Sequence, residues 1–197
     1  MSDTYHHGNL RQALIEAGIG IINESGEDGL SLRKAAMACN VSHAAPYAHF
    51  KDKDELIEAI KSSVTEQFMK ELEDAVNNAP NSEAALISMG KRYVSFFIRK
   101  PDYYKFLFGR RNIIAHLKID EETDEDYPPF VLLKKTYLKY LREKEIEKNE
   151  KEQEIELLNL WASAHGLAAI ACMPGVTASF DWNEMLEGDA LLRETEN

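Results

Sequence analysis

The sequence has 197 residues, of which 44% are hydrophobic, and a formal net charge of −11. This length allows a real core in one or two domains, and the negative charge argues against nonspecific nucleic-acid binding by the whole surface. No apolar stretch approaches the roughly 18 residues of a membrane span, and no signal peptide is recognisable. The chain is therefore expected to be cytoplasmic, without a membrane partner. Its two cysteines lie far apart in the sequence and are expected to be free thiols.

Apolar residues recur with helical spacing along the whole chain, and alternating runs are short. The sequence therefore predicts an all-α fold. The first helix is expected from about Asn9 to Ser25, with Gly26 and Gly29 ending it. Its buried stripe is expected to contain Leu10, Leu14, Ala17, Gly18, Ile21 and Ile22.

Residues 31–53, SLRKAAMACNVSHAAPYAHFKDK, contain the pattern of a helix-turn-helix, whose second helix lies in the major groove of DNA. Ser31 is a good N-cap for a short first helix with small alanines. Asn40 suits the turn, because Asn tolerates left-handed backbone angles. Ser42 is expected to cap the second helix, with Pro46 in its first turn.

The outer face of the second motif helix carries the side chains best suited to DNA. Phe50 should end this helix and point inward. His43 is suited to base edges, and Ala44 to thymine methyl groups. On the first motif helix, Arg33 suits the O6 and N7 atoms of guanine or, alternatively, a phosphate.

Over about His6–Leu56 the chain contains, in order, an apolar helix, Gly-Leu-Ser-Leu-Arg, Val-Ser, Pro-Tyr-x-His-Phe and Lys-Asp-Lys-Asp-Glu-Leu. This ordered run resembles the tetracycline-repressor (TetR) family of bacterial regulators. Asn40 departs from the family, which usually has Gly there. The resemblance implies that Tyr47, His49 and Lys53 hold the DNA backbone, although His49 also suits a partly buried helix end. The expected DNA-binding residues are Arg33, Ser42, His43, Ala44, Tyr47, His49 and Lys53.

Acidic residues outnumber basic ones over residues 1–60, which counts against a DNA-binding function. The basic residues, however, surround the motif, whereas most of the acids belong to other helix faces. Affinity for DNA should therefore depend on few phosphate contacts and on dimerisation, with a modest salt dependence. These basic residues are Arg11, Arg33, Lys34, Lys51 and Lys53.

The rest of the chain is expected to form a C-terminal bundle of about six helices. A long helix over about 54–78 should join a helix-turn-helix domain at 1–53 to a ligand-binding and dimerisation domain at 54–197. Pro80 and neighbouring asparagines break the chain. Later helices are expected at about 82–100, 103–108, 129–147, 152–173 and 182–194. The acidic segment DEETDED at 120–126 is interpreted as a solvated loop, since a cation site would need specific backbone turns.

The helix at about 152–173 is apolar over most of its circumference, so it should be buried on more than one side. The resemblance implies that the last two helices form a four-helix bundle with a partner subunit. We therefore expect a homodimer joined by about 152–173 and 181–194. A charge at Ala168 or Leu186 should dissociate it if either residue lies in the interface.

Aromatic residues on separate C-terminal helices suggest a site for a mostly apolar or aromatic small molecule. KPDYYKFLFGRR, together with Trp161, His165 and Gly166, resembles one subgroup of TetR-type effector domains. The alternative is that the same side chains fill a core, with His165 hydrogen-bonded inside it. The candidate ligand-binding residues are Tyr93, Phe97, Phe106, Tyr137, Trp161 and His165.

No sequence motif of an enzyme is present, and neither catalytic residues nor a cofactor or metal is expected. His6 and His7 are interpreted as lying near the DNA backbone or in solvent rather than as metal ligands. The expected function is a ligand-responsive transcriptional regulator, a repressor that binds a palindromic operator in double-stranded DNA as a dimer. Two alternatives stay open: a DNA-binding activator or architectural protein without an effector, and an effector-binding helical protein without DNA binding.

Overall fold

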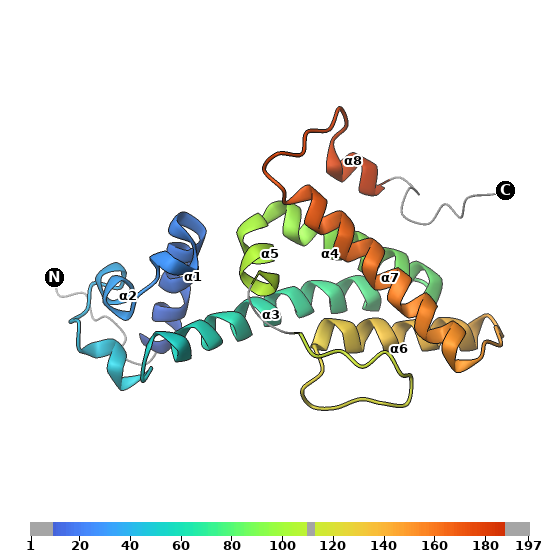
Figure 1. Cartoon of the computed structure of the whole chain (residues 1–197), viewed down its shortest axis with the longest axis horizontal. Helices are drawn as coiled ribbons and strands as arrows, with labels where there is room; N and C mark the ends of the chain where they lie inside the picture. The colour runs from blue at the N-terminus through green and yellow to red at the C-terminus, as the bar shows by residue number, and fades with distance from the viewer. Residues whose placement is uncertain (1–9, 110–112, 188–197) are drawn as a thin grey trace. The chain divides into compact units, whose positions relative to one another are not determined.

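The computed structural model describes residues 10–109 and 113–187, and within these ranges all regular structure is helical, as predicted. The predictions for His6, His7 and the last helix beyond Glu187 lie outside the described residues. Figure 1 shows the helices in chain order. They are α1 (Leu10–Gly29), α2 (Leu32–Ala38), the 3₁₀ helix η2 (Ala45–Ala48), α3 (Lys53–Asn77), α4 (Ser82–Arg99), α5 (Pro101–Phe108), α6 (Pro128–Glu143), α7 (Glu150–Ala171) and α8 (Trp182–Glu187).

The chain forms two compact units, and α3 contributes to both. The first unit comprises the chain up to Glu66 together with Lys105–Leu107. Its core is built from α1, α2, η2 and the first half of α3. The fully or almost fully buried side chains of this core include Leu14, Ile22, Leu32, Ala35, Ala36, Phe50, Leu56 and Ile60.

The second unit comprises Gln67–Tyr104 and the chain from Phe108 onward. Here α4 is the central helix, because it contacts α6, α7 and α8, and α6 also contacts α7 (Figure 1). No helix in the described part of the chain is both long and apolar enough to cross a lipid bilayer.

Gly18 of α1 lies directly against the side chain of Ile60 on α3. A Cβ atom added at Gly18 would lie 2.4 Å from Cδ1 of Ile60, which is fully buried. The missing side chain therefore lets the two helices pack at this point. Near the end of α1, Gly26 has a φ of 71° and breaks the regular helical path, as the sequence led us to expect.

The second helix of the motif is much shorter than predicted. The structure contains only the 3₁₀ turn Ala45–Ala48, in which the N–H of Tyr47 donates to the carbonyl of Ala44. Pro46 explains this, because proline lacks an N–H and disfavours the α conformation of the residue before it. The Ser42 side chain makes no capping hydrogen bond, so that expectation was wrong.

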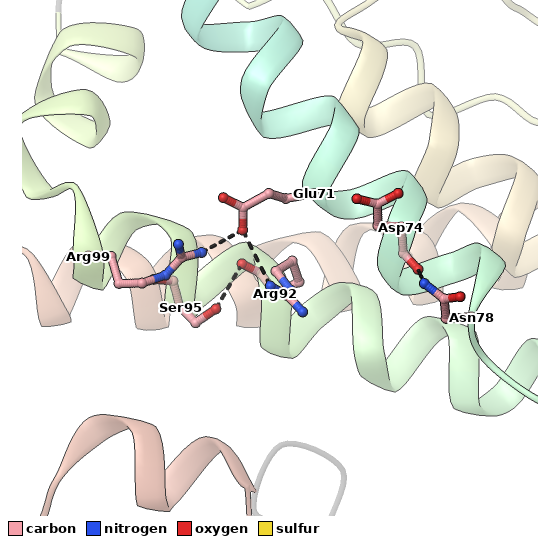
Figure 2. Close-up of polar contacts among 6 residues, drawn as sticks. All are labelled: Glu71, Asp74, Asn78, Arg92, Ser95 and Arg99. Atoms are coloured by element: carbon pink, nitrogen blue, oxygen red, sulfur yellow. Dashed lines mark hydrogen bonds and ion pairs between the residues drawn. The ribbon is translucent and has the colours of Figure 1, made fainter.

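Ion pairs fix α3 against α4 within the second unit. Glu71 of α3 accepts hydrogen bonds from the guanidinium groups of both Arg92 and Arg99 on α4 (Figure 2). The side chain of Glu71 is partly buried, whereas those of Arg92 and Arg99 are nearly half exposed, so these pairs are partly screened by solvent. One carboxylate therefore bridges two turns of α4.

The connection between α6 and α7 is fixed by local signals. The helix α6 ends at Glu143, earlier than expected, because Glu145 adopts a left-handed φ of 54° and the N–H of Ile146 reaches back to the carbonyl of Leu141. Asn149 and Glu152 then form a reciprocal capping box that starts α7.

Candidate DNA-binding motif and ligand cavity

The turn between α2 and η2 has the geometry that its residues predict. The side chain of Ser31 accepts a hydrogen bond from the N–H of Lys34, which caps α2. Asn40 has a φ of 53°, in the left-handed region. Pro46 and Phe50 are buried on the inner side of the motif. The segment therefore presents its remaining side chains outward.

Most of the predicted DNA-binding residues are exposed together on this short segment. Ser42, His43 and Ala44 are exposed, and the aromatic side chain of Tyr47 is 62% exposed. Arg33 is exposed on α2, whereas His49 is half-buried at the end of η2.

Lys53 differs from the other predicted residues because its ammonium group already has a protein partner. Its Nζ donates to the carbonyl oxygen of Glu27 at 3.0 Å, joining the start of α3 to the end of α1. Nearby, Asp52 accepts a hydrogen bond from the N–H of Glu55, and Glu55 accepts one from the N–H of Lys51. These contacts fix the backbone on which Lys51 and Lys53 are carried.

A cavity of about 170 Å³ lies in the second unit between α4, α6 and α7. Of the six predicted ligand-binding residues, Tyr93 and Trp161 line it. Its walls are mainly apolar and aromatic, which is usual for ligand pockets. The lining residues are Leu86, Ile87, Met89, Gly90, Tyr93, Tyr127, Pro129, Phe130, Leu133, Glu156, Asn159, Leu160, Trp161, Ser163 and Ala164.

His165 lies one turn beyond Trp161 and is not among the lining residues. Its Nδ1 is 2.8 Å from the hydroxyl of Tyr93, and its Nε2 is 2.8 Å from the hydroxyl of Tyr104. The ring of Phe108 packs edge-on against the imidazole, at 4.7 Å between centroids. Burial lowers the pKa of His165, so the neutral ring is favoured.

The other three predicted ligand-binding residues also lie away from the cavity. Phe97 is completely buried in a cluster of aromatic rings with Phe68 and Phe96. Phe106 is a buried residue of the first unit. Tyr137 is 1% exposed and donates its hydroxyl proton to Glu156.

Four polar residues of the cavity wall were not predicted, namely Tyr127, Glu156, Asn159 and Ser163, and the first two are partly buried. Tyr127 precedes α6, and its buried hydroxyl has no hydrogen-bond partner in the described structure. Glu156 accepts hydrogen bonds from Tyr137 and, at 2.7 Å, from Lys148. Burial alone would raise the pKa of Glu156, but the hydrogen bonds from Lys148 and Tyr137 outweigh it and lower that pKa.

Tyr127 and Glu156 lacked a clear sequence signal for a position in a ligand cavity. Tyr127 follows an acidic segment and precedes two prolines, a context typical of a loop. Glu156 lies in the charged run 143–156, which suggests a solvated surface. Their common position at the cavity follows only from the packing of α6 against α7.

The acidic loop before α6 is held by buried polar groups. The carboxylate of Asp126 accepts hydrogen bonds from the N–H groups of Thr123 and His116, which lower its pKa. The buried ammonium of Lys134 donates to the carbonyls of Lys118 and Glu121, at 2.8 Å each. Among the described residues, no group of three or more His, Cys, Asp or Glu side chains is placed to hold a metal ion.

Comparison with solved structures shows the same fold along almost the whole chain. A protein of unknown function from Rhodococcus sp. RHA1 superposes with a TM-score of 0.72, at 24% identity, over 94% of each chain. A putative transcriptional regulator from Pseudomonas aeruginosa PAO1 gives a TM-score of 0.68, at 20% identity, over 90% of this chain and 85% of that one. At such identities the likeness concerns the fold alone.

Sequence comparison identifies the N-terminal segment more closely. The HTH-type nicotine-responsive transcriptional repressor HdnoR of Paenarthrobacter nicotinovorans is 32% identical over 74 residues. This alignment covers 38% of the chain and only 38% of that relative's length. Residues 14–60 match the model for bacterial regulatory proteins of the tetR family. Residues 14–60 of this chain are therefore similar to the N-terminal domain of tetR-family regulators.

Proposed function

We propose that the chain is a ligand-responsive transcriptional repressor that binds a palindromic DNA operator as a homodimer in the cytoplasm. One observation carries the proposal. Arg33, His43 and Tyr47 are exposed together on a helix-turn-helix that matches the tetR family over residues 14–60. Arg and His offer hydrogen bonds to base edges, and Tyr offers one to a phosphate.

Dimerisation is supported by the two opposite faces of α7. Leu157, Ala164 and Ala168 are buried against the rest of the second unit. On another side of the same helix, Leu158 and Ile170 are 42% and 43% exposed. Exposed apolar residues on a regular helix favour contact with a second copy, and a two-fold dimer matches a palindromic operator.

Ala168 and Leu186 are unsuitable positions for disrupting the dimer, contrary to the expectation from the sequence. Ala168 is completely buried and Leu186 is 4% exposed within the single chain. A charge at either position would disturb the fold of the second unit before it tested the interface. Leu158 and Ile170 are suitable instead, because their side chains reach solvent in the isolated chain.

The cavity supports the ligand-responsive part of the proposal. A regulator without an effector would be expected to fill this space, whereas the second unit leaves about 170 Å³ between α4, α6 and α7. A small molecule that binds one conformation of the dimer better than another shifts the population toward it. Release from DNA follows if the favoured conformation spaces the two recognition segments wrongly for the operator. The grouping of Trp161, His165 and Gly166 with one effector subgroup belongs to this proposal.

The test is selection of duplex DNA from a random pool by the purified protein, followed by affinity measurements on the selected sequence. We expect an inverted repeat and a complex with two protein chains. Salt should weaken the complex only modestly, since few phosphates are contacted. Failure to enrich any sequence, with the protein folded, would refute the DNA-binding function.

A further inference from the structure

The cavity between α4, α6 and α7 opens to solvent along α7. Among the described residues that line it, only Asn159 and Ser163 are exposed, and both belong to α7. The lining residues of α4 and α6 are buried or half-buried, for example Tyr93 and Phe130. The mouth of the cavity therefore lies beside Asn159 and Ser163.

Asn159 also belongs to the outward side of α7. Residues three or four positions apart on a helix lie above one another, so a series with this spacing forms one line. Ser163 lies four positions after Asn159, directly beside this line. All members of the line are exposed except Gly166, which is half-buried. The outer line of α7 consists of Ile155, Asn159, Ala162, Gly166 and Ile170.

This side of α7 carries no charge, although the protein is acidic. From Leu157 to Phe180 the sequence contains no Asp, Glu, Lys or Arg, whereas the whole chain has a net charge of −11. The one histidine of this segment, His165, turns inward to the hydroxyls of Tyr93 and Tyr104. A second copy of the chain is equally acidic, so close contact costs least where neither copy presents a charge. The charge pattern therefore favours a second copy as the partner of this side.

The shape of the outer line also suits a second copy. Ala162 and Gly166 in its middle are small, whereas Ile155 and Ile170 near its ends are large and are 49% and 43% exposed. Two-fold contacts place the same patch of both copies against each other, and small side chains at a crossing point let two helices approach closely. Asn159 lies between Ile155 and Ala162. A partner helix that crosses at Ala162 and Gly166 therefore passes over the mouth of the cavity.

We propose that α7 of a second copy covers the mouth, so that the ligand site is complete only in the dimer. This inference rests on the proposed function, in which α7 forms the dimer interface and the cavity receives the effector. It adds that one side of one helix serves both purposes. A molecule in the cavity then exchanges with solvent only when the two copies separate or shift at Asn159. Occupancy of the site and dimerisation are therefore thermodynamically linked.

The test measures how accessible the mouth is in the full-length protein. Ser163→Cys places a thiol there, and peptide mass spectrometry distinguishes its alkylation by iodoacetamide from that of Cys39 and Cys172. We expect alkylation at least about 10-fold slower in the dimer than in the monomer made by Ile170→Glu, because the rate follows the fraction of time for which the mouth is uncovered. Lys139→Cys, on the exposed side of α6, is the matched control and should react equally fast in both forms.

A second readout leaves the mouth unaltered. Trp161 lines the cavity, and Trp182→Phe makes it the only tryptophan of the chain. Acrylamide should quench the fluorescence of Trp161 less in the dimer than in the monomer. Dilution to the monomer gives the same comparison without a substitution in the interface, so the test stands even if Ile170→Glu does not fold.

The outcomes separate this inference from the proposed function. Equal alkylation of Ser163→Cys, or equal quenching of Trp161, in dimer and monomer would overturn the inference and leave the proposed dimer and operator binding untouched. Slow alkylation in both forms would also overturn it, since the mouth would then be closed within a single copy. A wild-type protein that is monomeric at micromolar concentration would contradict the proposed dimer itself, and the covered mouth with it.

Discussion

The hydroxyl of Tyr93 on α4 and Nδ1 of His165 on α7 lie 2.8 Å apart in the interior of the second unit. The opposite ring nitrogen, Nε2, contacts the hydroxyl of Tyr104 at the same distance. A neutral imidazole has one donor and one acceptor nitrogen, so both are used and each tyrosine takes the complementary role. This chain of three polar groups joins α4, α5 and α7.

Replacing His165 with Ala should destabilise the protein by about 1–3 kcal/mol, because the buried hydroxyl of Tyr93 loses its hydrogen bond to the imidazole. Tyr93 is only 5% exposed, so water cannot readily replace the imidazole. Urea unfolding measures the loss. Tyr104→Phe is the matched control and should cost less, since Tyr104 is half-buried. Equal losses for the two variants would contradict this account.

The stability of the protein should depend on pH through His165. Burial lowers its pKa in the folded state, so the unfolded chain binds more protons between that lowered value and about 6.5. Stability should therefore rise with pH across this interval and level off above it. The difference in unfolding free energy between the wild type and His165→Asn isolates this contribution from that of Asp126. A difference that falls as pH rises would have the wrong sign.

Two glycines of α1 should respond in opposite directions to the same change. Gly20→Ala should stabilise the first unit by up to about 1 kcal/mol, because Ala is the better helix former and its Cβ meets no atom within 4 Å. Gly18→Ala should lose this gain or destabilise, since its Cβ would lie 2.4 Å from Ile60. Thermal unfolding of both variants provides the comparison. Equal shifts in Tm would show that Ile60 moves at no cost.

Substitutions in the motif should separate affinity from sequence preference. Tyr47→Ala and Lys53→Ala should weaken binding to all duplexes, whereas Arg33→Ala and His43→Ala should also relax base preference, by about 1–3 kcal/mol for a good base contact. Fluorescence anisotropy on the selected operator and on single-base variants measures both effects. If all four leave operator affinity unchanged, the assignment of the site is wrong.

Lys53 needs a second variant, because its ammonium group also contacts Glu27. Lys53→Gln keeps an N–H donor for that carbonyl but removes the charge. We expect it to weaken DNA binding with little change in stability. Lys70→Ala, an exposed lysine of α3 in the second unit, is the control for a nonspecific loss of charge.

A charge on the exposed face of α7 should dissociate the dimer. Leu158→Glu and Ile170→Glu should each give a folded monomer by analytical ultracentrifugation, because a carboxylate buried at an apolar interface is costly. Lys139→Glu on the exposed side of α6 should leave the oligomeric state unchanged. A wild-type monomer at micromolar concentration would refute the interface directly.

Local sequence signals predicted the helical fold well. Helical spacing of apolar residues located α1, α3, α4 and α7 closely, and Pro80 with its asparagines marked the break before α4. The left-handed turn at Asn40 and the inward position of Phe50 were also expected and are confirmed. These features depend on residues close together in the chain, so the sequence alone is informative.

Features that depend on distant contacts were not predictable in the same way. From the sequence, Lys134 would be expected to be an exposed lysine of a helix. In the structure it is 3% exposed, and its ammonium group donates hydrogen bonds to carbonyls of the loop before its helix. Tyr127 and Glu156 belong to a loop and a charged run, and only the packing of α6 and α7 brings them to one cavity. The sequence favours a longer helix than η2, because Pro46 is compatible with the first turn of a helix.

In the proposed complex with DNA, the bond between Lys53 and Glu27 lowers the entropic cost of fixing the Lys53 side chain. A free lysine side chain loses about 1.5–2 kcal/mol of rotamer entropy when it is fixed. Lys53 has already lost much of this freedom, since one of its three N–H groups is held by the carbonyl of Glu27. The remaining two can meet a phosphate without a further search of conformations. The carbonyl of Glu27, next to the break at Gly26, thus preorganises a cation more than twenty residues away.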